Sequence, residues 1–443
     1  MCFKKIDLLI KKRIFYLFVF IVVILFSLFV KRYNIYFILI TFGFLFYFLI
    51  LSIIIAKVHP TVSNSKPFPK KVPTVAVVTY AYNNFQAILL TVERLKKLKY
   101  PIPFTIYVIT DGTCKFLDNV SGVKQIILSK KYFQKSDINL KSVVLNKGLK
   151  YIKEENIFQV DGDTIPNKDV LMKLTGTLRD NVVMAIGSVG VTNTNSFIER
   201  MQVVEYNFGF GFPRMIMTAM NSLDIGTGAL CLYKRKIFNQ VGGYDVKNIT
   251  EDKEIVYKFI EQGYRAEFVI DAKAKTVVPN TWKGFFTQRI RWFRGGYDVT
   301  SKYIHFLFKK NIGFFSFFFI YTNLSLILGM LFVSKAIYNF VSTLVLNLYY
   351  YILNFVHYGF SFSDLFHLHI SFTPFMNSLL LLVLISVTVA LYFIIISFEY
   401  NNFKMERKYI IPLIYMIFVH GFILLLISII SIIYGVFGVK YKW

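Results

Sequence analysis

The stretch Ile-Phe-Gln-Val-Asp-Gly-Asp, residues 157–163, ends an apolar run in two carboxylates that flank a glycine. Apolar, partly β-branched residues bounded by turn residues predict a short buried strand over 156–160. Asp161 and Asp163 then follow the carboxyl end of that strand, where open α/β sheets bind their ligands. Two neighbouring carboxylates repel each other, so their chemistry favours a divalent cation such as Mg²⁺ or Mn²⁺. Taken alone, the triplet is equally compatible with a turn closed by Asx hydrogen bonds.

The composition is typical of a membrane protein that carries a soluble domain. Of the 443 residues, 55% are hydrophobic and 18% are aromatic. Lys and Arg total 51 against 25 Asp and Glu. In a membrane protein this excess of positive charge reflects the orientation of the chain in the bilayer and its contact with anionic lipids, or it attracts an anionic substrate. It does not indicate nucleic-acid binding. The three cysteines are widely spaced, so neither a disulfide framework nor a zinc site is expected.

Two apolar segments near the amino terminus, residues 14–30 and 35–56, predict a transmembrane hairpin within residues 1–58. A signal peptide is the alternative for the first segment, but no small-residue cleavage site follows it. Basic residues precede the first segment and follow the second, so both ends of the hairpin are expected in the cytoplasm. A proline-rich linker, residues 59–73, leads into the next region.

Residues 74–280 are predicted to form a soluble domain in which strands alternate with helices. We expect strands at 74–79, 104–110, 124–128, 156–160, 182–191, 226–233 and 265–270, and helices at 84–98, 138–153, 196–223 and 251–262. This alternation predicts an α/β, Rossmann-like fold with a mainly parallel sheet, and a binding site at the strand ends.

The composition changes again at residue 281. Residues 281–310 mix aromatic side chains with Lys and Arg, a pattern typical of amphipathic helices in the membrane interface. Residues 311–443 are predicted to form a membrane region of three spans, at 312–334, 374–397 and 410–437, or of four if the apolar but interrupted segment 336–372 also crosses. The protein is therefore expected to be a multi-pass protein of the plasma membrane, with membrane lipids as partners and its soluble domain in the cytoplasm.

Four acidic or mixed motifs fall at predicted strand ends or just beyond the domain. They are Asp111 in Thr-Asp-Gly-Thr, the pair Asp161 and Asp163, Thr250-Glu251-Asp252 at a helix start, and Gln288-Arg-Ile-Arg291-Trp292. Each also has a purely structural explanation. Asp111 could be a turn residue, the acids at 251 and 252 could only complement a helix dipole, and Trp292 could anchor the chain at the interface.

In this order and spacing, the motifs resemble the processive, membrane-integrated family 2 glycosyltransferases. These are the synthases of hyaluronan, poly-β-1,6-N-acetylglucosamine, chitin oligomers and cellulose, and the likeness covers residues 74–303. The resemblance implies a GT-A fold that uses a UDP-sugar and Mg²⁺ or Mn²⁺ to extend a polysaccharide acceptor. The segments 201–206, 250–252 and 288–296 look most similar to N-acetylglucosamine polymerases, with hyaluronan synthases next, so UDP-N-acetylglucosamine is the expected donor.

The resemblance also implies a role for each site residue. Asp252 would be the general base and Asp163 would ligate the metal. The UDP-sugar would be bound by Asp111, Lys141, Asp161, Gln288, Arg291 and Trp292. The acceptor would contact Trp292, Gly226, Thr227 and Glu251. Lys141 is also compatible with an ordinary solvated helix lysine, and Arg289, Arg291 and Arg294 with side chains that snorkel to lipid.

The chemistry is consistent with these roles. A sugar hydroxyl is a poor nucleophile, so a carboxylate must accept its proton during in-line attack. One base and one hydroxyl imply a single displacement, which inverts the anomeric carbon. Three other functions remain open at this point. They are a non-processive transferase that loads one sugar onto a lipid or glycolipid, a hyaluronan-type alternating copolymer synthase, and a transporter whose domain only binds a regulatory nucleotide.

Overall fold

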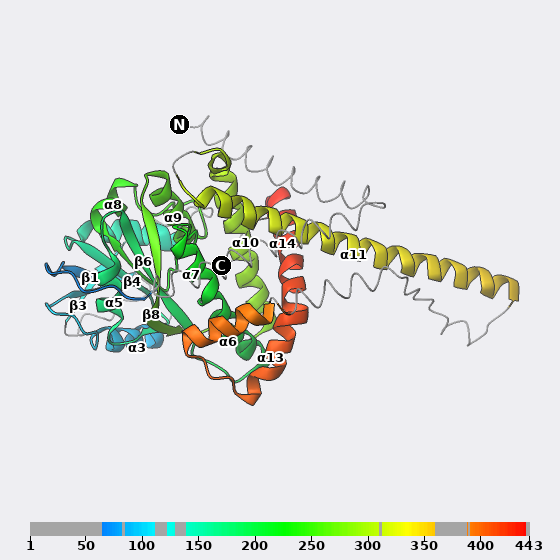
Figure 1. Ribbon diagram of the computed structural model, residues 1–443, viewed down its shortest axis with the longest axis horizontal. Coiled ribbons are helices and arrows are strands. Elements are labelled where there is room, and N and C mark those ends of the chain that lie inside the picture. Colours follow the sequence, from blue (N-terminus) through cyan, green and yellow to red (C-terminus); the bar gives the residue numbers. More distant parts are fainter. Residues whose placement is uncertain are drawn as a thin grey trace.

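The computed structural model describes residues 64–81, 85–110, 122–128, 139–309, 312–358, 388 and 390–439. The predicted hairpin at 14–30 and 35–56, the candidate Asp111 and most of the predicted span at 374–397 lie outside these residues. Figure 1 shows an α/β body on one side, with α10, α14 and the long α11 on the other.

The α/β body is built on one eight-stranded sheet in the order β3-β2-β1-β4-β7-β6-β8-β5. The strands are β1 Val75–Ala81, β2 Thr105–Thr110, β3 Val123–Ile127, β4 Asn156–Asp161, β5 Thr164–Pro166, β6 Val182–Val191, β7 Leu230–Lys234 and β8 Arg265–Thr276. The five residues of β4 before Asp161 are all buried, and β1 and β7 pair with its two edges, so β4 is a central strand of the sheet.

The predicted α/β class is confirmed, but the sheet is mixed where a mainly parallel one was expected. β4 and β6 each pair antiparallel with β7, and β5 pairs antiparallel with β8. A strand buried on both faces has the same apolar pattern in either direction, so the sequence does not reveal its orientation. β7 also begins at Leu230, four residues later than predicted, since residues 226–229 form a loop that turns toward α9.

The helices of the body mostly follow the predicted ranges. They are α3 Phe85–Leu95, α4 Leu140–Gly148, α5 Val170–Thr177, α6 Phe197–Gly209, α7 Phe212–Ala219, α8 Arg235–Gln240 and α9 Glu251–Glu261. α6 starts with a capping box between Ser196 and Glu199. The predicted helix at 196–223 breaks at Phe210 and Gly211, where glycines and a proline interrupt it. The short elements β5, α5 and α8 were not predicted.

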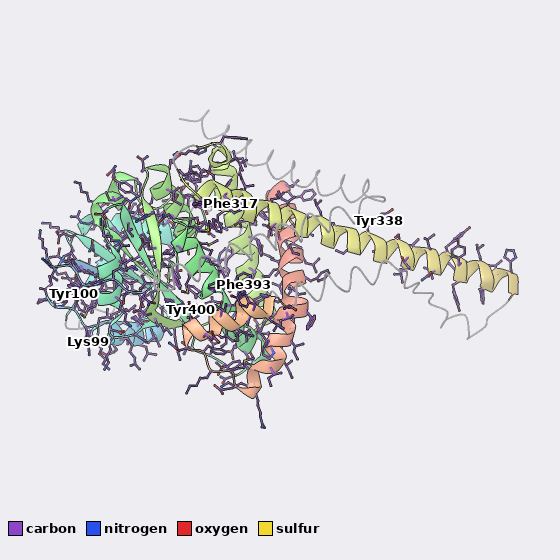
Figure 2. All side chains as sticks on the ribbon, in the orientation of Figure 1. Lys99, Tyr100, Phe317, Tyr338, Phe393 and Tyr400 are labelled. Carbon is purple, nitrogen blue, oxygen red and sulfur yellow. The ribbon has the colours of Figure 1, made fainter. Side chains whose placement is uncertain are left out.

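The helices after the body include α10 Trp282–Lys302, α11 Phe315–Tyr358, α13 Ile410–Tyr415 and α14 Gly421–Val436, and residues 390–401 are also helical. α10 packs on α14, and α14 packs on α11. The predicted span at 312–334 and the ambiguous residues 336–358 belong to one continuous helix, α11, whose second half extends away from the body (Figure 1). Tyr338 lies on that projecting half (Figure 2), where many apolar side chains are exposed.

One helical stretch within the described residues, Arg407–Val436, is long and apolar enough to cross a membrane. It has 30 residues and a mean hydropathy of 2.7. A shorter apolar stretch covers Phe315–Leu331 at the start of α11. The number of carboxyl-terminal spans stays a prediction.

Candidate active site

A cavity of about 850 Å³ opens beside the carboxyl end of β4. Its walls come from the sheet, from α4, α6, α7, α9 and α10, and, at the far end, from α11 and α14. Every predicted site residue that the structure describes lines it: Lys141, Asp161, Asp163, Gly226, Thr227, Glu251, Asp252, Gln288, Arg291 and Trp292. The antiparallel entry of β7 explains part of this convergence, because it brings the 226–229 loop beside Asp161.

Lys141 bridges two of the predicted carboxylates. Its Nζ donates to Asp161 Oδ1 at 2.7 Å and lies 3.1 Å from Glu251 Oε1. The Asn139 side chain, at the amino-terminal cap of α4, donates to the other Glu251 oxygen at 3.0 Å. Burial alone would lower the pKa of Lys141, but the two carboxylates outweigh it and hold that pKa above its ordinary value. Lys141 is therefore not a solvated helix lysine.

Asp252 lies in the first turn of α9, against the glycine loop. The Gly228 N–H donates to Asp252 Oδ2 at 3.2 Å, and the Gly226 N–H donates to the main-chain oxygen of Asp252 at 3.2 Å. A Cβ on Gly226 would lie 2.2 Å from that same oxygen, so only glycine permits this approach. Burial and the neighbouring Glu251 raise the pKa of Asp252, which makes its carboxylate more basic than an ordinary aspartate.

Asp163 follows Asp161 in the turn after β4. Thr276 Oγ1 donates to Asp163 Oδ1 at 3.2 Å, and Thr164 Oγ1 lies 3.4 Å from the same oxygen. Desolvation and the Asp161 carboxylate both raise the pKa of Asp163, so a nearby cation would stabilise its charged form.

The carboxylates fit a cation that is shared with a ligand. Among the residues the structure describes, no group of three or more His, Cys, Asp or Glu side chains is arranged to hold a metal ion. Mg²⁺ commonly takes only one or two carboxylates and completes its shell with water and phosphate oxygens. Asp163, with Asp161 beside it, supplies that smaller donor set.

The Gln-x-x-Arg-Trp motif lies in the middle of α10. Arg289 is 2% exposed and forms an ion pair with Glu205 of α6 at 2.6 Å. Its guanidinium lies 4.6 Å from the Phe285 ring centre and 4.1 Å from that of Trp292, and Nη1 donates to Gln288 Oε1 at 2.6 Å. Arg289 is therefore a buried structural cation and does not snorkel to lipid.

The protein-family comparison agrees with this geometry. Residues 157–437 match the description "Glycosyl transferase family group 2", which covers more than half of the chain. The chain belongs to this family. The resemblance drawn from the sequence motifs is thereby confirmed.

Several curated proteins resemble this family 2 chain. It is 24% identical over 271 residues to a poly-β-1,6-N-acetyl-D-glucosamine synthase of Staphylococcus epidermidis, across 58% of this chain and 65% of that protein. It is 27% identical over 223 residues to the synthase of the same name from Staphylococcus aureus, across 49% and 53%. The alignments thus span less than two thirds of these relatives' length.

Among solved structures, a mannosyltransferase from Pyrobaculum calidifontis, in complex with GDP-Man and Mn²⁺, superposes with a TM-score of 0.49 at 15% identity. That likeness covers 81% of this chain and 99% of the other. It is too weak to define the fold, which follows from the sheet described above.

Several cavity residues of the family 2 chain were not predicted. Glu205 and Arg214 come from α6 and α7, and Thr322, Asn323 and Ser325 come from α11. In the sequence, Glu205 and Arg214 are charges among the Met and aromatic residues of their helices, and nothing local marks them as site residues. The α11 residues are short polar side chains inside an apolar segment, and hydropathy averages over them.

Proposed function

We propose that this protein is an inverting, processive β-glycosyltransferase that polymerises a UDP-sugar, UDP-N-acetylglucosamine, into an extracellular polysaccharide. The observation that carries the proposal is the single cavity that holds Asp161, Asp163, Asp252 and the Gln-x-x-Arg-Trp motif and continues to α11 and α14. The names of the staphylococcal relatives support the choice of sugar.

Asp252 is proposed as the general base. It accepts the proton of the acceptor hydroxyl while that oxygen forms a bond to the anomeric carbon of the donor sugar. The bond from this carbon to the diphosphate oxygen breaks in the same step, and UDP leaves with the bonding electrons. Attack from the face opposite the leaving group converts an α-linked donor to a β-linked product. The Gly228 N–H donates to Oδ2 of Asp252 and holds this carboxylate in place. The raised pKa of Asp252 favours transfer of the proton to it.

Cations neutralise the negative charge that develops on the departing diphosphate. Arg291 lines the cavity, and its planar guanidinium can meet two phosphate oxygens at once. Lys141 and the carboxylates at 161 and 163 are proposed to orient the nucleotide, together with Asp111, which lies outside the described residues. A Mg²⁺ or Mn²⁺ ion at Asp163 would neutralise charge on the diphosphate when bound.

Trp292 is proposed to support the terminal acceptor sugar. The residue is 38% exposed, and it lines the cavity together with residues of the sheet domain and of α11 and α14. In this arrangement residues 74–280 form the GT-A catalytic domain in the cytoplasm and residues 281–310 the interface helices. Residues 1–58 and 311–443 form the membrane region of the plasma-membrane protein, through which the product leaves.

Activity of the purified full chain tests the proposal. The protein in lipid nanodiscs is incubated with single UDP-sugars and Mg²⁺ or Mn²⁺, and UDP release and product length are measured, with Asp252→Asn as the inactive control. Long polymer from UDP-N-acetylglucosamine supports the proposal. Long polymer from another UDP-sugar refutes the donor assignment. A lipid bearing one sugar would instead favour the non-processive transferase, whose lipid acceptor would contact Leu326, Leu424 and Leu425 in the cavity wall. Absence of turnover with every nucleotide sugar contradicts the proposed glycosyltransferase activity.

A further inference from the structure

Among the cationic side chains of the cavity, Arg214 has no function in the mechanism above. Lys141 is paired with Asp161 and Glu251, Arg289 with Glu205, and Lys253 with Asp224 at 3.3 Å. Within the residues that the structure describes, no carboxylate oxygen lies within 4.0 Å of the Arg214 guanidinium. Arg214 is thus a cation in the cavity wall without an ion pair.

The Arg214 guanidinium is nevertheless held in one place. Nη1 donates to Thr227 Oγ1 at 2.8 Å, and the guanidinium carbon lies 3.7 Å from the centre of the Phe210 ring. Thr227 belongs to the glycine loop that contacts Asp252, so Arg214 is fixed beside the proposed base. A stacked, tethered guanidinium loses little conformational entropy when a ligand binds.

The helix that carries Arg214 is itself braced from outside the sheet domain. The Phe212 ring of α7 contacts the rings of Phe393 and Tyr400, both labelled in Figure 2. The Phe212 N–H donates to Ser397 Oγ at 3.1 Å. The side chain of Asn401 donates to the main-chain oxygens of Asn207 and Phe210, at 2.8 and 3.0 Å. The start of α7 is therefore rigid where Arg214 enters the cavity.

Asp224 and Asp252 attract the Arg214 guanidinium from more than 4.0 Å away, but neither contacts it, so its charge is only partly compensated. Burial lowers the pKa of Arg214 to about 10, which still leaves it fully charged at neutral pH. A buried charge is stabilised when a ligand oxygen replaces the water it has lost. Carbonyl and carboxylate oxygens accept such hydrogen bonds more strongly than a sugar hydroxyl does, and the free edge of the guanidinium can meet either.

We infer that Arg214 forms a specificity subsite for a carbonyl or carboxylate oxygen on the sugars that are joined beside Asp252. An acetamido or carboxyl substituent on the ring would bind to it, whereas a ring that carries only hydroxyls would leave the cation poorly paired. This inference rests on the proposed function, and it goes further by naming the residue that selects the sugar class. The substituent belongs either to the incoming donor sugar or to the acceptor.

The test compares donors in the wild type and in Arg214→Met, in the full-length protein in nanodiscs. We expect the wild type to prefer UDP-N-acetylglucosamine or UDP-glucuronate over UDP-glucose by about ten- to a hundredfold in kcat/KM. Arg214→Met should reduce that preference to about twofold and leave the affinity for UDP alone unchanged. Arg214→Lys keeps the positive charge but lacks the planar guanidinium that can donate two parallel hydrogen bonds, so its preference for the substituted donors should be intermediate.

A second arm keeps the donor fixed and compares acetylated with unacetylated β-linked oligosaccharide primers. Loss of preference in the donor series alone assigns the substituent to the incoming sugar, and loss in the primer series alone assigns it to the acceptor. Either result supports the subsite. Arg200→Met is the matched control, because Arg200 is also half-buried and bonded to neutral oxygens, at Thr194 and Asn195, but lies outside the cavity.

Other outcomes overturn the inference. If Arg214→Met weakens UDP binding by the same factor as turnover, the diphosphate is the ligand of Arg214. If it slows turnover of substituted and unsubstituted sugars equally while UDP binding is unchanged, Arg214 is structural. Should the Met variant fail to fold, Thr227→Val removes the oxygen that holds Nη1, and it must also reduce the preference for substituted over unsubstituted sugars. A wild type that uses nucleotide sugars without any preference refutes the subsite alone, whereas a wild type without any turnover refutes the proposed function as well.

Discussion

The cavity has two walls that handle charge in opposite ways. The sheet wall is formed by the strand ends and the start of α9, and the helix wall by α6 and α10. On the sheet side, Asp252 and Asp163 contact hydroxyls or backbone N–H groups and have raised pKa values, so their charge is available to a ligand. On the helix side, Arg289 and Glu205 neutralise each other at 2.6 Å in a buried pair. Beside this pair, α10 presents the Gln288 amide, the Trp292 ring and the Arg291 guanidinium to the cavity.

This difference separates chemistry from positioning. Groups with uncompensated charge can take a proton or a cation, whereas a compensated pair can only hold its neighbours in place. The sheet wall should therefore determine whether a bond forms. Apart from Arg291, which is proposed to meet the departing diphosphate, the helix wall should determine how well the acceptor is held and how stable the protein is.

The largest effect is expected for Asp252→Asn, which removes the base from the sheet wall. We expect turnover to fall by roughly 10²–10⁴, because the acceptor hydroxyl loses its proton acceptor. UDP affinity should stay within about twofold of wild type, since the amide keeps the shape of the side chain. Radiolabelled sugar incorporation and calorimetric UDP binding measure the two. An active Asp252→Asn enzyme would remove this residue from the mechanism.

Asp163→Ala is expected to affect binding before chemistry. Loss of the carboxylate should weaken UDP binding by about ten- to a hundredfold when Mg²⁺ or Mn²⁺ is present, because one charged ligand of the cation is gone. In EDTA the variant and the wild type should bind UDP alike. A variant that loses equal affinity with and without metal would show that Asp163 contacts the nucleotide directly.

The comparison of the two walls also explains what the sequence could predict. The sheet wall was predictable because its acids follow apolar strands or open a helix, and Asp161, Asp163 and Asp252 do converge on one cavity. The antiparallel direction of β7 was not predictable, since a doubly buried strand has no directional pattern.

The helix wall was predicted only in part. Gln288, Arg291 and Trp292 were found through their motif, but Glu205 lies 84 residues from its partner Arg289. A pairing at that separation depends on how α6 and α10 pack, and a carboxylate in a mostly apolar helix does not indicate it. Arg214 was missed for the same reason, because its partner Thr227 comes from a different element.

Glu205→Gln tests the helix wall and should have a smaller effect on turnover. The change leaves the Arg289 charge buried without a counter-ion, which is expected to reduce the free energy of unfolding by about 1–3 kcal/mol. We also expect shorter products, because Gln288 and Trp292 lose their support. Thermal unfolding followed by tryptophan fluorescence measures the first, and gel sizing the second.

Glu406→Gln provides the matched control. Glu406 pairs with Lys408 at 2.9 Å, but both side chains are largely exposed, so its loss should change stability by less than about 1 kcal/mol. If both glutamine variants unfold at the wild-type temperature, the Glu205 pair contributes nothing to stability and the proposed contrast between the walls is wrong.

The smallest expected effect is a shift in the pH profile of Glu251→Gln. Asp252 works as a base only when it is deprotonated, so activity falls as the pH drops through its pKa, which burial and Glu251 raise above the usual aspartate value. Replacing Glu251 removes a neighbouring negative charge, so the pKa of Asp252 should fall. The acid limb of kcat/KM should then move to lower pH by less than about one unit. Lys141 keeps its 2.7 Å contact with Asp161 in this variant, so UDP binding controls for the fold of the site. A shift toward higher pH would mean that Lys141, once released by Glu251, no longer stabilises the charged base.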